Sequence, residues 1–213
     1  MNKVRLKLAA GAALLAAAGL AQAQLSLPGL PGLPGLPGLP GGDPAATVVG
    51  QAAALTATIN GVTTSLGSSG SVSDPSQPVG AGQALVSIPG VLSAESLHSA
   101  AMAWTDQVAS QASLSNLVLT VAGTGITAGF LGSEALALAG AGTSGASAIE
   151  ALKIGGVAVT PAGIPNQLVS LPGLSVILNE QIQSANGIVV NALRVKTLDG
   201  LTDVALGTSR AGI

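Results

Sequence analysis

Apolar and polar residues alternate along two early stretches of the chain, a pattern that predicts half-buried β-strands. The first runs from Gln51 to Ile59 and ends at Asn60-Gly61, and the second runs from Gln83 to Ile88 and ends at Pro89-Gly90. Between them, residues 65–82 are rich in glycine, serine and proline, which is the composition of a loop. We therefore expect two strands joined by a long mobile loop.

The last 40 residues predict a three-stranded β-meander. Apolar runs at 175–182, 188–195 and 201–208 are separated by Asn186-Gly187 and Asp199-Gly200. Asparagine, aspartate and glycine tolerate the positive φ angles that tight hairpin turns require. Consecutive strands joined by two short turns pair with their neighbours as a meander.

The central part of the chain contains an internal repeat, in which residues 92–119 correspond to residues 126–154. Leu97 and Ala101 align with Leu131 and Ala135, and a one-residue slip later aligns Leu117 with Leu152. Each copy is a run of small residues, a turn and a second run, which predicts two related hairpins in neighbouring, equivalent places. The first runs are apolar at odd and even positions alike, so we expect both of their faces to be buried.

These elements together predict an all-β domain, an antiparallel β-sandwich or a strongly bent sheet built from the repeated hairpins and the C-terminal meander. A β-solenoid-like stack is the alternative, although two copies are fewer than solenoids usually need. The alanine-rich runs 92–104 and 126–139 favour helix by propensity. The interleaved serine, threonine and glycine residues weaken such a helix, so we predict strands there.

The N-terminal residues have the pattern of a secretory signal peptide. Basic residues within 3–7 precede an apolar stretch at 8–20 and the small-residue site Ala21-Gln22-Ala23, which predicts cleavage before Gln24. Residues 24–44 then repeat Leu-Pro-Gly five times. Five triplets are too few for a collagen triple helix, so the tract is interpreted as a stiff linker or a docking segment. Residues 45–213 remain as a single β domain.

The composition of the chain limits the kinds of partner it could bind and the compartment in which we expect it. After cleavage, four basic residues remain against nine acidic ones (Lys153, Arg194, Lys196 and Arg210 are the basic ones). This balance argues against a nucleic-acid partner, because phosphate binding needs a basic surface. No membrane span is expected once the signal is removed, and the chain has no cysteine. We expect export to a bacterial periplasm or beyond the cell, where an envelope or extracellular polymer is a possible partner.

Few residues are candidates for chemistry. His98 is the one histidine, and a hydrolase would have to pair it with a serine and with Glu95 or Asp106. One histidine without cysteine cannot bind zinc in the usual way, and no calcium-loop pattern is present, so no cofactor is expected. Glu180 is interpreted as a solvent-face strand residue or as a cross-strand partner of Arg194 or Lys196. Asp199 is interpreted as a turn residue. Trp104 is the one tryptophan and a possible stacking platform for a glycan.

Several short motifs together resemble the choice-of-anchor P family. The motifs are Gly90-Val-Leu-Ser-Ala94, Gly125-Ile-Thr-Ala128, 165–173, 176–182, 187–195 and 203–213. Members of that family are exported bacterial proteins with varied C-terminal anchoring tails, and the resemblance implies a β body without an established activity. No hydrophobic tail precedes Ile213, so no anchor of that kind is expected.

The leading hypothesis is a non-catalytic exported protein, structural or adhesive, at the cell envelope or outside the cell. One alternative is a β module that binds glycans or another polymer, with Trp104 and His98 as candidate surface residues. A further alternative is a hydrolase of unknown type that uses His98. Binding to an ice or crystal face is weaker still, because no regular Thr-x-Thr ladder is present.

Overall fold

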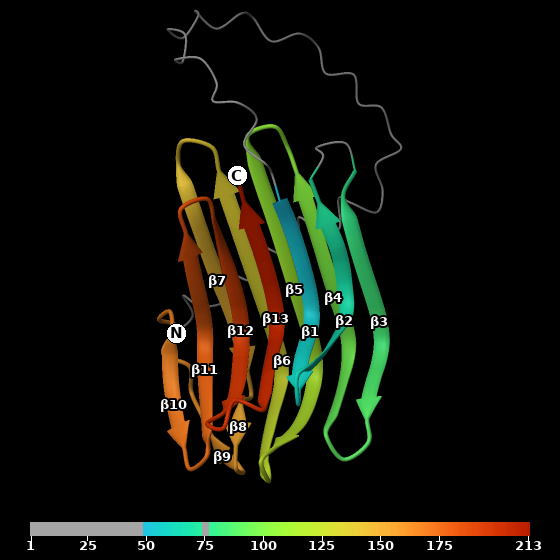
Figure 1. The fold of residues 1–213 in the computed structure, drawn as a ribbon, viewed down its shortest axis with the longest axis vertical. Helices are drawn as coiled ribbons and strands as arrows, with labels where there is room; N and C mark the ends of the chain where they lie inside the picture. The colour runs from blue at the N-terminus through green and yellow to red at the C-terminus, as the bar shows by residue number, and fades with distance from the viewer. Residues whose placement is uncertain (1–48, 74–76) are drawn as a thin grey trace, which may run out of the picture. The chain divides into compact units, whose positions relative to one another are not determined.

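The computed structural model describes residues 49–73 and 77–213, and this part of the chain is a β-sandwich of two antiparallel sheets (Figure 1). The predicted signal peptide 1–23 and linker 24–44 lie outside the described residues. The strands are β1 (Val49–Ile59), β2 (Val62–Val72), β3 (Val79–Ile88), β4 (Leu92–Ala103), β5 (Gln107–Val121), β6 (Thr124–Leu138), β7 (Gly142–Glu150), β8 (Lys153–Ile154), β9 (Val157–Ala158), β10 (Gln167–Leu171), β11 (Leu174–Ser184), β12 (Gly187–Thr197) and β13 (Thr202–Gly212).

Sheet A has the strand order β10-β11-β12-β13-β1-β2. Sheet B has the order β3-β4-β5-β6-β8-β9, and β7 also pairs with β6. This order is that of a sandwich rather than of the alternative solenoid-like stack. The C-terminal meander is confirmed, because β11, β12 and β13 pair in sequence through the turns at 185–186 and 198–201.

The prediction of a loop at residues 65–82 is wrong. Strand β2 continues to Val72 and β3 already begins at Val79, so most of this stretch forms strands. Its glycines serve as bends within a strand rather than as a loop, since Gly67 and Gly70 have φ angles of 58° and 76° inside β2. Ser69 stabilises the bend, because its hydroxyl accepts the N–H of Ala52 at 3.0 Å and donates to the carbonyl of Ala52 at 3.2 Å.

The two copies of the repeat form adjacent hairpins of sheet B. The first copy is β4–β5, the second is β6 with β7 and β8, and β5 pairs with β6. This agrees with the neighbouring places expected from the repeat. The expectation that both faces of the first runs are buried is wrong, because in β4 the exposed His98 alternates with the buried Leu97 and Ser99.

A row of residues with left-handed backbone conformation (positive φ) explains why the predicted burial was wrong. Ser96 has a φ of 50°, and this single residue places Ala94 and Leu97 on the same inward face although their positions differ in parity. Asn116 does the same in β5, between the buried Leu114 and Leu117. We call this set of residues the crossover row; it comprises Gly67, Ser96, Asn116, Ala151, Asn179 and Gly207.

The neighbours of the crossover row are small. A Cβ on Gly207 would lie 3.2 Å from the Cβ of Ala192, and one on Gly67 would lie 3.1 Å from that of Ala54. Left-handed residues bring the backbone close to adjacent strands, which favours small residues at the paired positions. Asn116 and Ala151 occupy corresponding positions of the two repeat copies.

The crossover row separates two cores. The leucine end, at the bottom of Figure 1, contains 24 buried hydrophobic residues, of which 12 are leucine. The alanine end, at the top, contains nine, of which five are alanine and none is leucine. Small side chains let the two sheets approach at the alanine end, where the hydroxyls of Ser133 and Ser209 hydrogen-bond at 2.6 Å.

Candidate functional site

The outer face of sheet A carries a shallow hollow of about 220 Å³, with both polar and apolar lining residues, over strands β12, β13, β1 and β2. We call it the hydroxyl hollow; it is lined by Gln51, Ala52, Ala53, Thr56, Ser65, Val189, Thr208 and Arg210. Arg210 lies between Val189 and Gln51 in the strand register, and its side chain is exposed. The Oγ1 of Thr56 and the Oγ of Ser65 are 3.1 Å apart across β1 and β2.

An ionic network adjoins the hydroxyl hollow. The Oγ1 of Thr208 donates to Asn191 Oδ1 at 2.7 Å, and Asn191 Nδ2 donates to Glu180 Oε2 at 2.6 Å. Arg194 Nη1 donates to both oxygens of Glu180 at 3.0 Å. Arg194 Nε and Nη2 donate to the two oxygens of Asp203 at 2.9 and 2.7 Å. Of the roles predicted for Glu180, the pairing with Arg194 is therefore confirmed, and the solvent-face position is wrong, because Glu180 is buried.

Hydrogen bonds within the network favour the charged forms of Arg194 and Asp203. Hydrogen bonds from Arg194 hold the pKa of the Asp203 carboxyl below its usual range. The hydrogen bonds to Asp203 raise the pKa of the Arg194 guanidinium, so it stays protonated. Arg194 is bound by both Glu180 and Asp203, so it is not free to bind a ligand, and Arg210 is the cation that lines the hollow.

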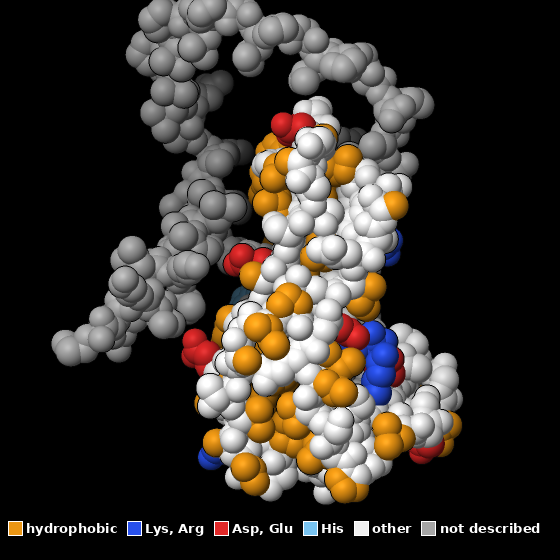
Figure 2. Space-filling view, turned by 90° about the vertical axis from the view of Figure 1, so that its left-hand side faces the viewer, with side chains coloured by type: hydrophobic (Ala, Val, Ile, Leu, Met, Phe, Trp, Pro, Cys, Tyr) orange, Lys and Arg blue, Asp and Glu red, His pale blue; other side chains and the backbone are white. Residues whose placement is uncertain are grey.

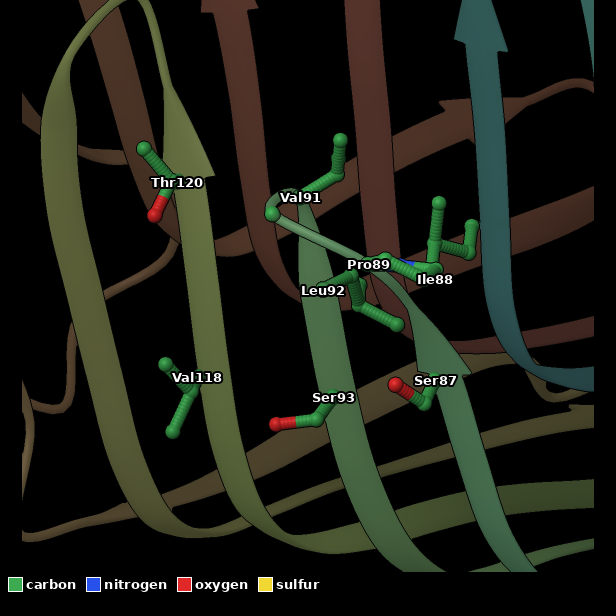
Figure 3. Close-up of a pocket in the computed structure, with 9 residues that line it drawn as sticks. Ser87, Ile88, Pro89, Val91, Leu92, Ser93, Val118 and Thr120 are labelled. Atoms are coloured by element: carbon green, nitrogen blue, oxygen red, sulfur yellow. The ribbon is translucent and has the colours of Figure 1, made fainter.

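A smaller hollow of about 180 Å³ lies on the outer face of sheet B at the β3–β4 turn (Figure 3). The side chains of Ser87 and Ser93 point toward Val118, whose exposed fraction is 51% (Figure 3). Val91 and Thr120 line the same hollow from the turn and from β5. This hollow offers hydroxyls and an apolar floor but no charged group.

The structure does not bring the two candidate surface residues together. His98 lies on the exposed outer face of β4, opposite Gly82 of β3 and Ser113 of β5. Trp104 follows the end of β4, where its backbone N–H donates to the carbonyl of Gln107 at 2.7 Å. Six strand positions separate them, which is about 20 Å of extended chain.

The groups considered for a hydrolase are also dispersed. Glu95 accepts a hydrogen bond from Asn116 at 2.8 Å, and Asp106 lies in the turn after β4. Within residues 49–73 and 77–213, His98 makes no hydrogen bond with a carboxylate, and no three His, Cys, Asp or Glu side chains form a metal-binding group. Asp199 has the predicted turn role, because its Oδ1 accepts the N–H of Leu201 at 2.9 Å.

The side of the sandwich formed by β7, β9 and β10 is weakly charged, and hydrophobic side chains gather over its lower part (Figure 2). Val157, Ile164 and Leu168 have exposed fractions of 68, 58 and 59% there. Among the described residues, no helix has the length and hydropathy of a membrane span.

The hydroxyl hollow was not predicted from the sequence. Its residues come from four strands that are up to 159 positions apart, Gln51 to Arg210, and only the strand order of sheet A assembles them. The alternation in 51–59 did place Thr56 on an outward face. No motif distinguished Arg210 from the other basic residues.

Comparison with known proteins adds no relative, because no family model, curated protein or solved structure matches the chain.

Proposed function

We propose that this chain is a non-catalytic exported bacterial protein with a structural or adhesive role at the cell envelope or outside the cell. The observation that carries the proposal is the outer edge of sheet B. Strand β3 is ten residues long, contains no charged residue and ends the sheet among the described residues. Long uncharged edge strands are ready to pair with another chain, and soluble proteins usually protect them. The resemblance to the choice-of-anchor P family supports export and implies no established activity.

Export rests on the N-terminal pattern of basic residues, apolar stretch and small-residue site. The test is fractionation of cells that express the chain with a C-terminal tag, followed by N-terminal sequencing of the exported material. We expect periplasmic, surface or medium material that begins at Gln24. Material that still begins at Met1, retained in the cytoplasm, would refute the proposal.

The role itself is tested by adhesion. Beads coated with the exported protein, and cells with and without its gene, are measured for attachment to each other and to abiotic surfaces. Beads coated with a sandwich protein of similar size and charge serve as the control. We expect attachment to depend on this protein. Equal attachment in its presence and absence would contradict an adhesive or structural role.

The hydroxyl hollow favours a second candidate, a module that binds a glycan or another hydroxylated polymer. Threonine and serine hydroxyls, the Gln51 amide and the Arg210 guanidinium all offer hydrogen bonds, and arginine also pairs with carboxylates. A polymer with hydroxyl and carboxylate groups, such as an acidic polysaccharide, suits this set.

This candidate is tested on a glycan array with the exported protein and two variants. Arg210→Ala removes the cation of the hollow, and Trp104→Ala removes the tryptophan, which lies outside the hollow. We expect binding of acidic glycans to be lost in Arg210→Ala and kept in Trp104→Ala. Loss of binding only in Trp104→Ala would move the site to the β4–β5 turn, and no binding at all would eliminate the glycan hypothesis.

A further inference from the structure

Most edges of the sandwich carry a feature that discourages pairing with another chain. Strand β10 has five residues and β9 has two, so both offer little backbone to a partner. Strand β2 is longer, but Gly67 and Gly70 have positive φ angles within it, and its register against β1 shifts at Ala52/Ala53. Such bulges twist an edge away from flat pairing.

Strand β10 covers only Leu174–Leu178 of β11, and an asparagine side chain covers one residue of the rest of that edge. Beyond β10, Asn166 Oδ1 accepts the N–H of Gln181 at 2.8 Å and Asn166 Nδ2 donates to the carbonyl of Gln181 at 3.2 Å. The amide group thus takes the place of one more residue of a neighbouring strand. Across the sandwich, Gln181 Nε2 donates to the carbonyl of Gly145, so the outer edge of β7 is covered in part as well.

Strand β3 has none of these features. It runs for ten residues and contains no proline, lysine or other charged residue. Its pairing register against β4 is constant along the strand. No strand pairs with its far side within the described part of the chain (Figure 1). Gln83 and Leu85 are exposed on it, Leu85 with a fraction of 59%. The row of N–H and C=O groups on that side can pair with an extended chain.

We propose that this extended chain is the β3 strand of a second copy, paired antiparallel across a two-fold axis so that two sheets B become one continuous sheet. Two identical edges without charge meet without like-charge repulsion, which a charged edge would suffer. A two-fold axis gives both copies the same contacts. This proposal rests on the structural or adhesive role, because it names the contact through which copies would assemble.

The test uses the exported chain in sedimentation velocity over a concentration series, with hydrogen–deuterium exchange at each concentration. We expect a monomer–dimer equilibrium. Hydrogen–deuterium exchange of the peptide covering 79–88 should slow as the fraction of dimer rises. The control peptide 62–72 covers β2, and its exchange should not depend on concentration. This measurement needs no variant, so it stands whether or not any substitution folds.

Matched variants locate the contact. Gln83→Lys/Leu85→Lys adds two exposed cations to β3, and Val62→Lys/Thr64→Lys adds two exposed cations to β2. Circular dichroism and thermal melts establish that each variant is folded. We expect the β3 variant to be monomeric at concentrations at which the unaltered chain and the β2 variant are dimeric.

Three results would overturn the proposal. They are a chain that stays monomeric at all concentrations, a dimer that the β3 lysines leave intact, and concentration-dependent protection on β2 or β7 instead of β3. Any of them combined with retained attachment in the bead assay would refute this contact and leave the adhesive role standing. Dimerisation through β3 without attachment would instead refute the role and keep the contact.

Discussion

Arg194 joins two carboxylates on the outer face of sheet A, and the more buried of the two depends on it. The side chain of Glu180 is 9% exposed and that of Arg194 is 22% exposed. Replacing Arg194 with methionine would keep most of the volume but leave Glu180 without a cation. We expect a loss of about 3 kcal/mol of unfolding free energy, the lower end of the range for breaking a buried pair, measured by urea unfolding. Lys196→Met is the control, since Lys196 forms no ion pair in the described chain and should change stability by less than about 0.5 kcal/mol.

Asp203 predicts how stability responds to acid. Its pKa in the folded chain lies below the ordinary value of 3.8, so between the two values the unfolded state binds more protons. The stabilisation is therefore complete above about pH 4 and is lost as pH falls through the lower, folded pKa. The effect is modest because the carboxyl is partly exposed. Urea midpoints from pH 2 to 7 should fall less steeply below pH 4 in Asp203→Asn than in the unaltered chain; equal slopes would contradict this.

Leu131 and His98 differ in burial although they lie in the same sheet, on β6 and β4, with β5 between them. Leu131 is 0% exposed, whereas His98 is on the outer face. Leu131→Asp would bury an unpaired charge and should unfold the domain, while His98→Ala should change stability by less than about 1 kcal/mol. Thermal melts measure both. The reverse order, a critical His98 and a tolerant Leu131, would mean that the histidine has a function that its exposed position does not suggest.

At the scale of elements, the close approach of the sheets at the alanine end limits side-chain size. A Cβ on Gly145 would overlap Cγ2 of Val190 and lie 3.0 Å from Cδ1 of Ile188 in the facing sheet. We expect Gly145→Ala to cost about 1–3 kcal/mol through overpacking. Gly125→Ala is the matched control, because Gly125 lies in the same sheet, has no positive φ and has nothing within 4 Å of the added Cβ. Urea unfolding that gave equal stability for both variants would contradict the close approach.

The strands and hairpins were largely predictable because their determinants are local. The alternation in 51–59 and the turn dipeptides Asn186-Gly187 and Asp199-Gly200 placed β1 and the meander correctly. The crossover row was not predictable. Ser96 and Ala151 are not residues that favour positive φ, and their conformation follows from packing against adjacent strands. For the same reason the period-two pattern failed at Ala94 and Leu97, and the strands within 65–82 went unrecognised.

The candidate site was less predictable than the fold. Opposite charges on neighbouring strands of a meander suggested a partner for Glu180, but the sequence left Arg194, Lys196 and a solvent-face position open, and the structure selects Arg194. The hydroxyl hollow depends on β1 lying between β13 and β2. The pairing of β1 with β13 joins the first and last strands of the domain. No local sequence pattern predicts that Gln51 lies opposite Arg210.

At the scale of the whole molecule, one sandwich contains two cores of unequal strength on either side of the crossover row. Leucine side chains bury far more apolar area than alanine side chains, so the leucine end should contribute most of the hydrophobic stabilisation. Opening of the alanine end alone should therefore cost less free energy than opening of the leucine end. Strands β4, β5 and β6 cross both cores, so each provides an internal comparison within one element.

We expect native-state hydrogen exchange to show this difference along single strands. In β5, amides near Leu117 and Leu119 at the leucine end should exchange more slowly than those near Val108 at the alanine end and near Ala112, which belongs to neither core. All four residues are buried and paired within the same strand, so neither exposure nor absence of pairing would account for the difference. Ala112→Leu would test the cause, because it enlarges a side chain where the sheets lie close; it should speed exchange at the alanine end before it affects the leucine end. Uniform exchange along β5 would mean that the crossover row bends the sheets without dividing their stability.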